Sequence, residues 1–166
     1  RGFDLLGVPY DGQSTLGYPG SRDAPERVRK CAGWINMRIQ GGRIYSLERD
    51  EEIEVGDRLF VDRGDLQVFP HDVTATFEST ARGVSATIEA GRVPIVIGGD
   101  DSILFPVAQG VHASLPGRIG IIHFDAHLDL MDYSERQGRY SQSSGMRRAL
   151  ELERVAAQDC IQVCER

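Results

Sequence analysis

The segment Asp125-Ala126-His127-Leu128-Asp129 places three potential metal ligands at alternate positions of the chain. In an extended segment, residues i, i+2 and i+4 point to the same side, so the two carboxylates and the imidazole converge on one region. This ligand set suits Mn²⁺, Fe²⁺, Zn²⁺ or Ni²⁺ better than a soft cysteine site does. A chance grouping of surface polar residues is the alternative, but the segment ends a buried-strand pattern, where α/β folds keep their sites.

A second acidic group follows the preceding predicted strand and reads Gly98-Gly99-Asp100-Asp101-Ser102. The two glycines permit a tight turn from strand to helix, and Asp100, Asp101 or Ser102 could serve only as a helix cap. We expect one carboxylate to cap the helix and the other to bind metal. We expect the two strands to be adjacent and parallel, so that both acidic groups share one site.

The elements that position these groups alternate between helix and strand from residue 72 onward. A stripe of apolar residues predicts a helix that ends near Gly91: Val73, Phe77, Ala81, Val84 and Ile88. The sequence then predicts a strand over 93–97 that is apolar on both faces, a second helix over 103–115 and a strand over 118–125. This pattern is a repeated βαβ crossover.

The remaining segments fit the same fold class. We predict a strand over 3–8, a Gly/Pro-rich loop over 11–23, a helix that opens at Pro25 and a short strand over 59–62. Residues 146–157 have some helical face and lead to a short buried strand over 160–164. The prediction is one α/β domain fragment, residues 1–166, with a mostly parallel sheet. Because the chain opens with Arg and stops just after a strand, we expect it to be cut at both ends.

Composition excludes several classes of protein. A net charge of −6 disfavours nucleic acid as the main partner, and the apolar runs are far too short to cross a bilayer. No secretion signal opens the chain, and three cysteines cannot all pair with one another. Cys160 and Cys164 lack the second pair that a structural metal site needs. We expect a cytoplasmic protein with free thiols.

Several segments together resemble the ureohydrolases, the arginase and agmatinase group. His-Phe-Asp-Ala-His-Leu-Asp at 123–129 matches that family's highly specific His-Phe-Asp-Ala-His-x-Asp motif, and Gly-Gly-Asp-Asp-Ser at 98–102 is similar to its Gly-Gly-Asp-His-Ser motif. Residues 8–12 with 19–25, and Asp-Arg-Gly-Asp at 62–65, are similar to its opening loop and to its Asp-x-Gly-Asp strand end. The resemblance covers nearly the whole chain.

The resemblance implies a three-layer αβα fold and two Mn²⁺ ions, bridged by a hydroxide that attacks a guanidino or amidino carbon and releases urea or a related fragment. Asp125 would bridge both ions, Asp129 and Asp101 would bind one, and His127 the other. Asp100 would lie next to the ligands without binding metal itself. We expect His123, inside a strand, to be a packed residue. A homo-oligomer, trimer or hexamer, is also implied.

Two departures from the family pattern bear on function. Asp101 stands where the family has His, which leaves ligation possible but alters the charge of the site and makes Ni²⁺ or another divalent ion an alternative. Gln142 stands where the family has a His that assists proton transfer, and an amide cannot shuttle protons. The family's remaining metal aspartates would lie beyond Arg166.

A different class of function therefore stays open beside the hydrolase. A catalytically impaired paralogue or partner subunit would keep the fold and lose activity through Asp101 and Gln142. A nucleotide-binding domain is disfavoured because the chain has neither a Gly-x-Gly-x-x-Gly nor a Gly-x-x-x-x-Gly-Lys-Ser/Thr motif.

Overall fold

The computed structural model describes residues 2–14, 18–55 and 60–163. The strands are β1 (Phe3–Val8), β2 (Arg43–Ser46), β3 (Glu51–Glu54), β4 (Phe60–Asp65), β5 (Val93–Gly98), β6 (Ile119–Phe124) and β7 (Val155–Val163). The helices are α1 (Ala24–Asn36), α2 (Val73–Glu89), α3 (Leu104–Ser114) and α4 (Gly145–Ala149), with short 3₁₀ turns η1 (Ser21–Asp23), η2 (Asp101–Ile103) and η3 (Gln142–Ser144). Within these ranges, no helix has the length and apolar character that a bilayer crossing requires.

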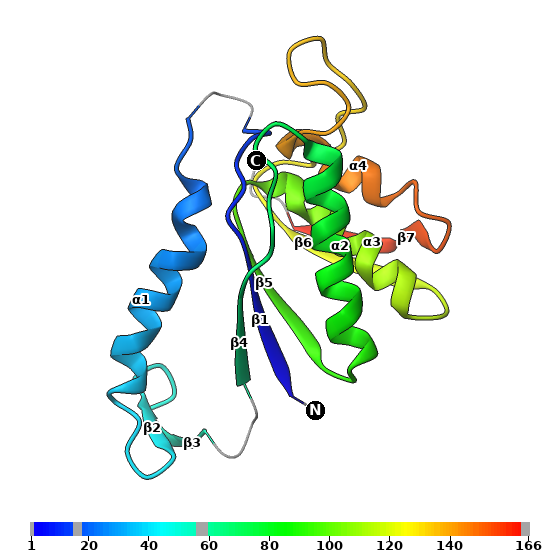
Figure 1. Ribbon diagram of the computed structural model, residues 1–166. Coiled ribbons are helices and arrows are strands. Elements are labelled where there is room, and N and C mark those ends of the chain that lie inside the picture. Colours follow the sequence, from blue (N-terminus) through cyan, green and yellow to red (C-terminus); the bar gives the residue numbers. More distant parts are fainter. Residues whose placement is uncertain (1, 15–17, 56–59, 164–166) are drawn as a thin grey trace.

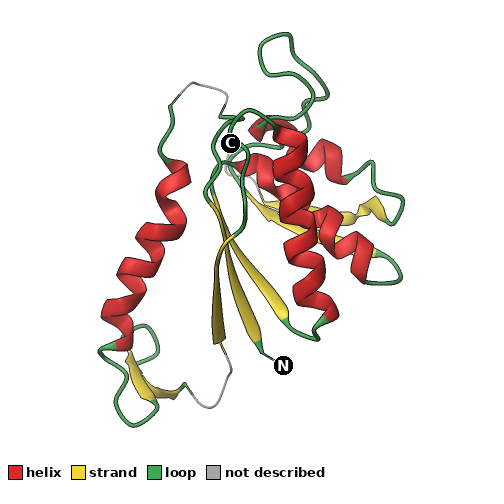
Figure 2. Cartoon of the chain, viewed as in Figure 1, coloured by secondary structure: helices red, strands yellow, loops and turns green. Residues whose placement is uncertain are grey.

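Parallel pairing organises the strands of the main body. The order β4-β1-β5 forms one sheet, β6 and β7 form a second, and both are parallel, whereas β2 and β3 form an antiparallel hairpin. Helices α1 and α2 both pack on this first sheet, from opposite sides in Figure 1. Figure 2 shows the resulting alternation of helix and strand, which is the α/β architecture that the sequence predicts.

Helix α2 forms where the apolar stripe predicts it. Its first turn is capped by Asp72, whose carboxylate accepts a hydrogen bond of 2.9 Å from the amide of Ala75. Gly91 follows the helix with a φ of 72°, a conformation that glycine adopts without steric cost. On the buried face, Phe77 lies edge-on to Phe105 and to Tyr140, with ring centroids 5.9 and 5.5 Å away, so α2 forms part of the core with α3.

Strand β1 is the most deeply buried strand, and the loop after it is held close to the end of β5. A Cβ atom on Gly99 would lie 1.7 Å from the carbonyl oxygen of Tyr10, so only glycine permits this approach. The amide of Asp100 donates a hydrogen bond of 2.9 Å to the same carbonyl. The opening loop is therefore placed directly against the acidic turn that follows β5.

Three sequence expectations are wrong. The sequence predicts that β5 and β6 are adjacent, but within the described ranges β5 pairs with β1 and β6 pairs with β7. The last helix ends at Ala149 rather than near residue 157, because the chain turns into β7. That strand begins at Val155 and is largely exposed, so the expectation of a buried strand over 160–164 fails, with Cys164 outside the described residues.

Two further differences concern the first half of the chain. The sequence does not predict the hairpin of β2 and β3, because each strand is only four residues long and neither alternates strictly between polar and apolar residues. Strand β4 runs from Phe60 to Asp65, three residues further than expected, and Leu59 lies outside the described residues.

Candidate metal centre

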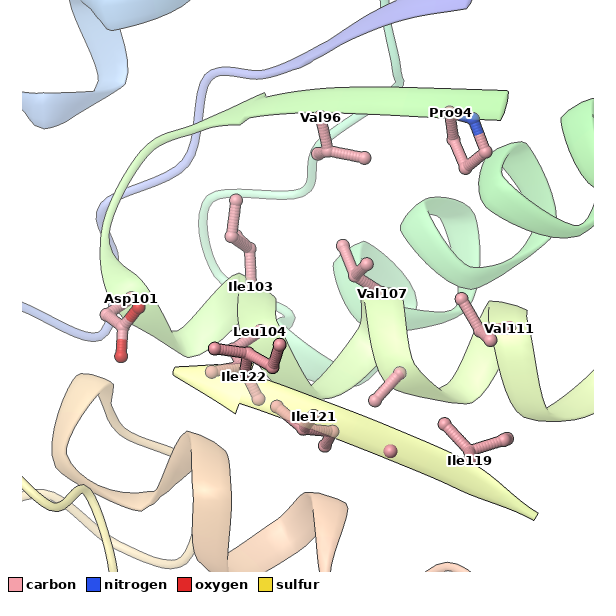
Figure 3. A pocket seen from close by; sticks show the side chains of 12 residues that line it. Pro94, Val96, Asp101, Ile103, Leu104, Val107, Val111, Ile119, Ile121 and Ile122 are labelled. Atoms are coloured by element: carbon pink, nitrogen blue, oxygen red, sulfur yellow. The ribbon is translucent and has the colours of Figure 1, made fainter. Parts of the chain in front are cut away.

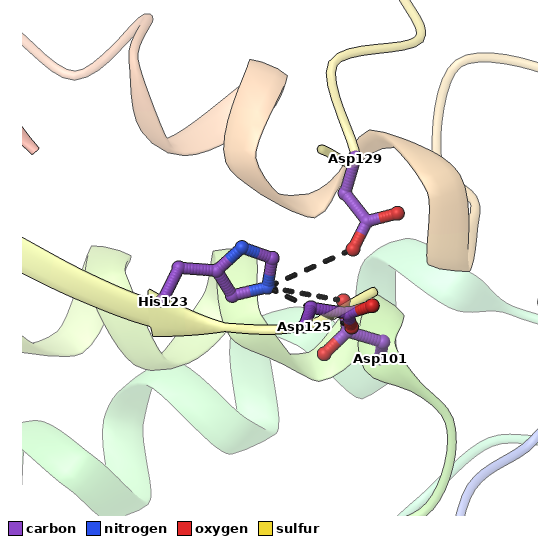
Figure 4. Close-up of side chains that lie close together, drawn as sticks. All are labelled: Asp101, His123, Asp125 and Asp129. Carbon is purple, nitrogen blue, oxygen red and sulfur yellow. Dashed lines mark ion pairs between the residues drawn. The ribbon is translucent and has the colours of Figure 1, made fainter. Parts of the chain in front are cut away.

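Four side chains meet where β5 and β6 end. They are Asp101, His123, Asp125 and Asp129, and one ligand atom from each lies within 4.8 Å of the others. Figure 4 shows the His123 ring pointing toward the three carboxylates, with Nε2 lying 4.0 Å from Asp101, 3.9 Å from Asp125 and 3.7 Å from Asp129. Although β5 and β6 do not pair, their carboxyl ends deliver ligands to one place.

The two neighbouring aspartates after β5 have different environments. The buried Asp100 carboxylate accepts hydrogen bonds from the amides of Ser102, at 3.0 Å, and Gln13, at 2.9 Å. Burial raises the pKa of Asp100 above its usual value. Asp100 thus caps the turn η2 and leaves Asp101 facing the cluster, the division expected from the sequence. The role of Asp101 as a ligand stays a prediction.

Asp129 reaches the cluster through an unusual backbone conformation. Its φ is 50°, in the left-handed region that few residues other than glycine adopt, and aspartate is among those that tolerate it. The amide of Arg147 in α4 donates a hydrogen bond of 3.0 Å to the Asp129 carbonyl. Helix α4 therefore fixes the backbone from which the buried Asp129 carboxylate points inward.

The electrostatics of the cluster favour a cation. Burial, followed by the neighbouring carboxylates of Asp129 and Asp125, raises the pKa of Asp101 to about 8. Burial alone would also raise the pKa of Asp125, but hydrogen bonds from the His127 amide and ring, and the charge of His123, bring it below its usual value. Among the described residues, Asp101 Oδ2, Asp129 Oδ2 and His123 Nε2 are buried without a hydrogen-bond partner. A divalent cation would satisfy all three atoms.

His127 lies beside this cluster rather than inside it. Its side chain is 73% exposed, and its Nδ1 atom lies 3.1 Å from Asp125 Oδ1. Its amide donates a hydrogen bond of 2.8 Å to the same oxygen. The structure thus brings together three of the four ligands predicted from the sequence, and His127 contacts one of them. Metal binding by His127 stays a prediction.

His123 is the member of the cluster that the sequence analysis assigned to packing. It is buried, as expected, but its ring also faces the carboxylates, while Nδ1 lies 3.2 Å from Nε2 of Gln162 in β7. A signal for this role was present in the sequence. His123 precedes Asp125 by two residues, and the alternation of a strand places such residues on the same side.

Gln142 opens the turn η3, which packs against η2. Its amide donates a hydrogen bond of 3.3 Å to the carbonyl of Gln13, whose own amide is bound by Asp100. The turn that carries Gln142 is thereby connected to the turn that carries Asp101. A catalytic role for the Gln142 side chain stays a prediction.

Comparisons with known proteins agree with the motifs. A model described as the Arginase family matches residues 1–166. Agmatinase from Bacillus subtilis (strain 168) is 32% identical over 150 residues, which cover 89% of this chain and 47% of that protein. The structure of formimidoylglutamase from Bacillus subtilis has a TM-score of 0.77 at 26% identity, over 98% of this chain and 47% of that one. That of Trypanosoma cruzi formiminoglutamase with Mn²⁺ has a TM-score of 0.79 at 23% identity, over 98% and 52%. The chain spans about half the length of these relatives.

Proposed function

Because the chain belongs to the arginase family, we propose that the protein is a metal-dependent hydrolase that cleaves a C–N bond of a small guanidino or amidino compound. Solved relatives share its fold, which confirms the arginase-like α/β architecture expected from the motifs. The observation that carries the proposal is the cluster of three carboxylates and one imidazole, whose ligand atoms lie within 4.8 Å of one another.

The residues present fit a divalent metal. Asp101, Asp125 and Asp129 offer oxygen ligands, His123 offers nitrogen from the middle of the cluster, and His127 lies next to Asp125. Oxygen and imidazole donors suit Mn²⁺, the ion of the Trypanosoma cruzi formiminoglutamase structure, and also Ni²⁺. When bound, a pair of such ions supplies a hydroxide nucleophile near neutral pH and stabilises developing negative charge.

The chain's own residues prepare the site for that chemistry. Asp100 holds the Gln13 backbone, and Gln13 accepts the hydrogen bond that positions the Gln142 turn. The Gln142 amide, if it reaches the substrate, can orient it by hydrogen bonding but cannot move a proton.

A catalytically impaired paralogue or partner subunit is the second candidate. Asp101 and Gln142, in the two positions where the resemblance places His, favour it. Such a protein would bind metal through the same cluster and release no product. A homo-oligomeric state and a cytoplasmic location remain predictions from the sequence.

The experiment that tests the proposal is a substrate panel. Protein stripped with chelator and reloaded with Mn²⁺ or Ni²⁺ is incubated with arginine, agmatine, guanidinobutyrate, guanidinopropionate and formimidoylglutamate, and urea or formamide is measured. We expect metal-dependent release from at least one compound, abolished by Asp125→Asn but retained by Glu52→Gln, an exposed acid of the β2–β3 hairpin. Bound metal with no release from any compound would favour the partner subunit instead.

A further inference from the structure

Helix α4 contacts the backbones of two residues of the candidate metal cluster. The amide of Arg147 donates a hydrogen bond of 3.0 Å to the Asp129 carbonyl. At the start of the helix, a Cβ atom on Gly145 would lie 3.2 Å from the Asp101 carbonyl oxygen, so α4 also abuts the turn η2. Figure 3 shows the Asp101 side chain at one end of an apolar pocket of about 470 Å³. Because that side chain borders open volume, the placement of Asp101 depends on contacts of its backbone, and α4 provides one of them.

The segment that follows Asp129 is attached to the same helix and to the turn before it. The amide of Met131 donates a hydrogen bond of 3.0 Å to the carbonyl of Ser143 in η3. The Nη2 atom of Arg148 in α4 donates a hydrogen bond to the Asp132 carboxylate and lies 3.2 Å from the carboxylate of Glu151. Residues 129–132 are thus fixed to η3 and α4 by two backbone hydrogen bonds and one side-chain ion pair.

Arg148 carries its charge into the interior of the protein. Its side chain is 1% exposed, and among the described residues its Nε and Nη1 atoms are buried without a hydrogen-bond partner. Burying a charged group costs free energy unless the group is paired and hydrogen-bonded, and replacing a buried ion pair by apolar residues of similar volume is often neutral or stabilising. A methionine would therefore fill this position about as stably, and packing alone does not explain an arginine.

Within the described ranges, three arginines lie close to Asp132, and of these three only Arg148 is buried. Arg147 Nε lies 3.5 Å and Arg139 Nη1 3.9 Å from Asp132 Oδ1, and their side chains are 41% and 50% exposed, so solvent screens both contacts. The hydrogen bond from Arg148, more than the charges of the other two, brings the pKa of Asp132 below its usual value. Arg148 therefore makes the principal side-chain contact between α4 and this segment.

We propose that Arg148 is a positioning residue of the metal cluster. By holding Asp132, it keeps α4 against residues 129–132, and α4 in turn fixes the separation of the Asp129 and Asp101 backbones. The two carboxylates then stay at a spacing at which they can share a cation, since the ligand atoms of the cluster lie within 4.8 Å of one another. The inference rests on the metal-binding part of the proposed function and does not depend on which compound is cleaved.

The first test measures Mn²⁺ affinity in the complete protein as it is encoded, stripped with chelator. We expect Arg148→Met to raise the Kd from isothermal titration calorimetry about tenfold or more. The melting temperature of the metal-free variant should fall by no more than about 2 °C, because the substitution also removes a buried charge. Arg148→Lys keeps a charged donor beside Asp132 and should recover most of the affinity. Arg136→Met, at an exposed arginine of the segment that precedes α4, is the matched control and should change the Kd by no more than about twofold.

A second test needs no metal. Hydrogen exchange of the Arg147 amide reports its bond to the Asp129 carbonyl, and in metal-free protein we expect Arg148→Met to speed this exchange at least about tenfold while the amides of β1 stay as in the parent. If Arg148→Met does not fold, Asp132→Asn, at a side chain that is 63% exposed, tests the same contact from its other end. It should raise the Mn²⁺ Kd and the Arg147 exchange rate in the same direction.

The possible outcomes separate this inference from the proposed function. A parent that binds Mn²⁺ beside an Arg148→Met variant that binds it equally well overturns the role of Arg148 alone, as does unchanged exchange of the Arg147 amide. A large fall in the melting temperature of both Arg148→Met and Arg148→Lys would make Arg148 a residue of general stability and also overturns the proposal. A parent that binds no Mn²⁺ contradicts the metal centre of the proposed function, and this inference with it.

Discussion

Carboxylates at the two ends of β1 and its neighbours are balanced in opposite ways. Near the amino end, Asp4 is 2% exposed and is paired with Arg92 and, at 3.0 Å, with Arg63. Burial would raise its pKa, but hydrogen bonds from the two arginines bring it below the usual value. At the carboxyl end, Asp101 lies among other carboxylates without an arginine in the cluster, and its pKa rises to about 8. The protein thus supplies its own cation at one end and leaves room for an external one at the other.

The largest change in stability is expected at the amino end, where arginines of the protein balance the Asp4 carboxylate. Asp4→Ala leaves two arginines beside an apolar strand without their counter-ion, so we expect the melting temperature to fall by on the order of 10 °C. Thermal unfolding followed by circular dichroism measures this, with Glu52→Ala at the exposed Arg43 pair as the control. Equal losses for the two variants would show that burial of Asp4 makes no difference.

The next effect is expected at the end where the cation is external. Chelator-stripped protein should gain about 2.7 kcal/mol at a Mn²⁺ concentration about 100 times the Kd, which corresponds to about 5–10 °C in melting temperature. A scan across Mn²⁺ and Ni²⁺ concentrations measures it. Asp4→Asn, if it folds, should gain as much from metal as the parent, because Asp4 lies at the other end of the strands. A melting temperature of the parent that stays constant across the titration would show that the cluster does not bind these metals.

Substitutions of Asp101 test whether this carboxylate is one of the groups that bind the external cation. We expect Asp101→Ala to weaken metal binding about tenfold or more and Asp101→His to retain it, as isothermal titration calorimetry would measure. If the protein is active, Asp101→His should move the pH profile toward lower pH, because a neutral ligand leaves the ions more acidic toward water. If Asp101→Ala binds metal and turns over substrate like the parent, Asp101 is not a metal ligand and is only part of the turn η2.

The smallest effect is expected in the pH dependence of the metal-free protein. The pKa of Asp4 is lowered by folding, so its contribution to stability is present above its usual value near 3.8 and is lost as pH falls below that range. The pKa of Asp101 is raised from 3.8 to about 8, so its contribution is present below the lower value and is lost as pH rises toward the higher one.

Because the Asp101 side chain is 40% exposed, solvent screens part of the repulsion, and we expect only a few °C across the alkaline range. Melting temperatures of metal-free parent and Asp101→Asn from about pH 4 to 9 measure it. The substitution should reduce the fall in melting temperature as pH rises, and saturating Mn²⁺ should do the same for the parent. An alkaline loss that is identical in Asp101→Asn would assign it to other groups.

The sequence predicts this fold best where local pattern decides the structure. The α2 stripe, the β1 segment and a cap by one of the carboxylates after β5 all depend on neighbours in sequence, and the structure has them as expected. The order of parallel strands depends instead on which distant segments share an edge, and for this reason the expected adjacency of β5 and β6 fails. Exposure of β7 likewise depends on what covers it rather than on its own apolar residues.

The candidate site shows the same division. Proximity of Asp101 and Asp125 follows from the ends of β5 and β6, which a sequence displays. The direction of His123 also follows from alternation, because His123 lies inside β6, whereas the outward position of His127 depends on where the chain leaves the strand. The left-handed turn at Asp129 redirects the segment after Asp125, so strict alternation does not extend to its end.

The backbone of Asp129 also restricts how this position can change over evolutionary time. A φ of 50° admits asparagine and glycine beside aspartate, whereas glutamate, alanine or a β-branched residue would add strain of about 1–2 kcal/mol. A lineage that abandons the carboxylate is therefore expected to pass first through Asp129→Asn or Asp129→Gly, both of which a single nucleotide change in an aspartate codon produces. Relatives that have lost the site should carry one of these two substitutions as a record of the route.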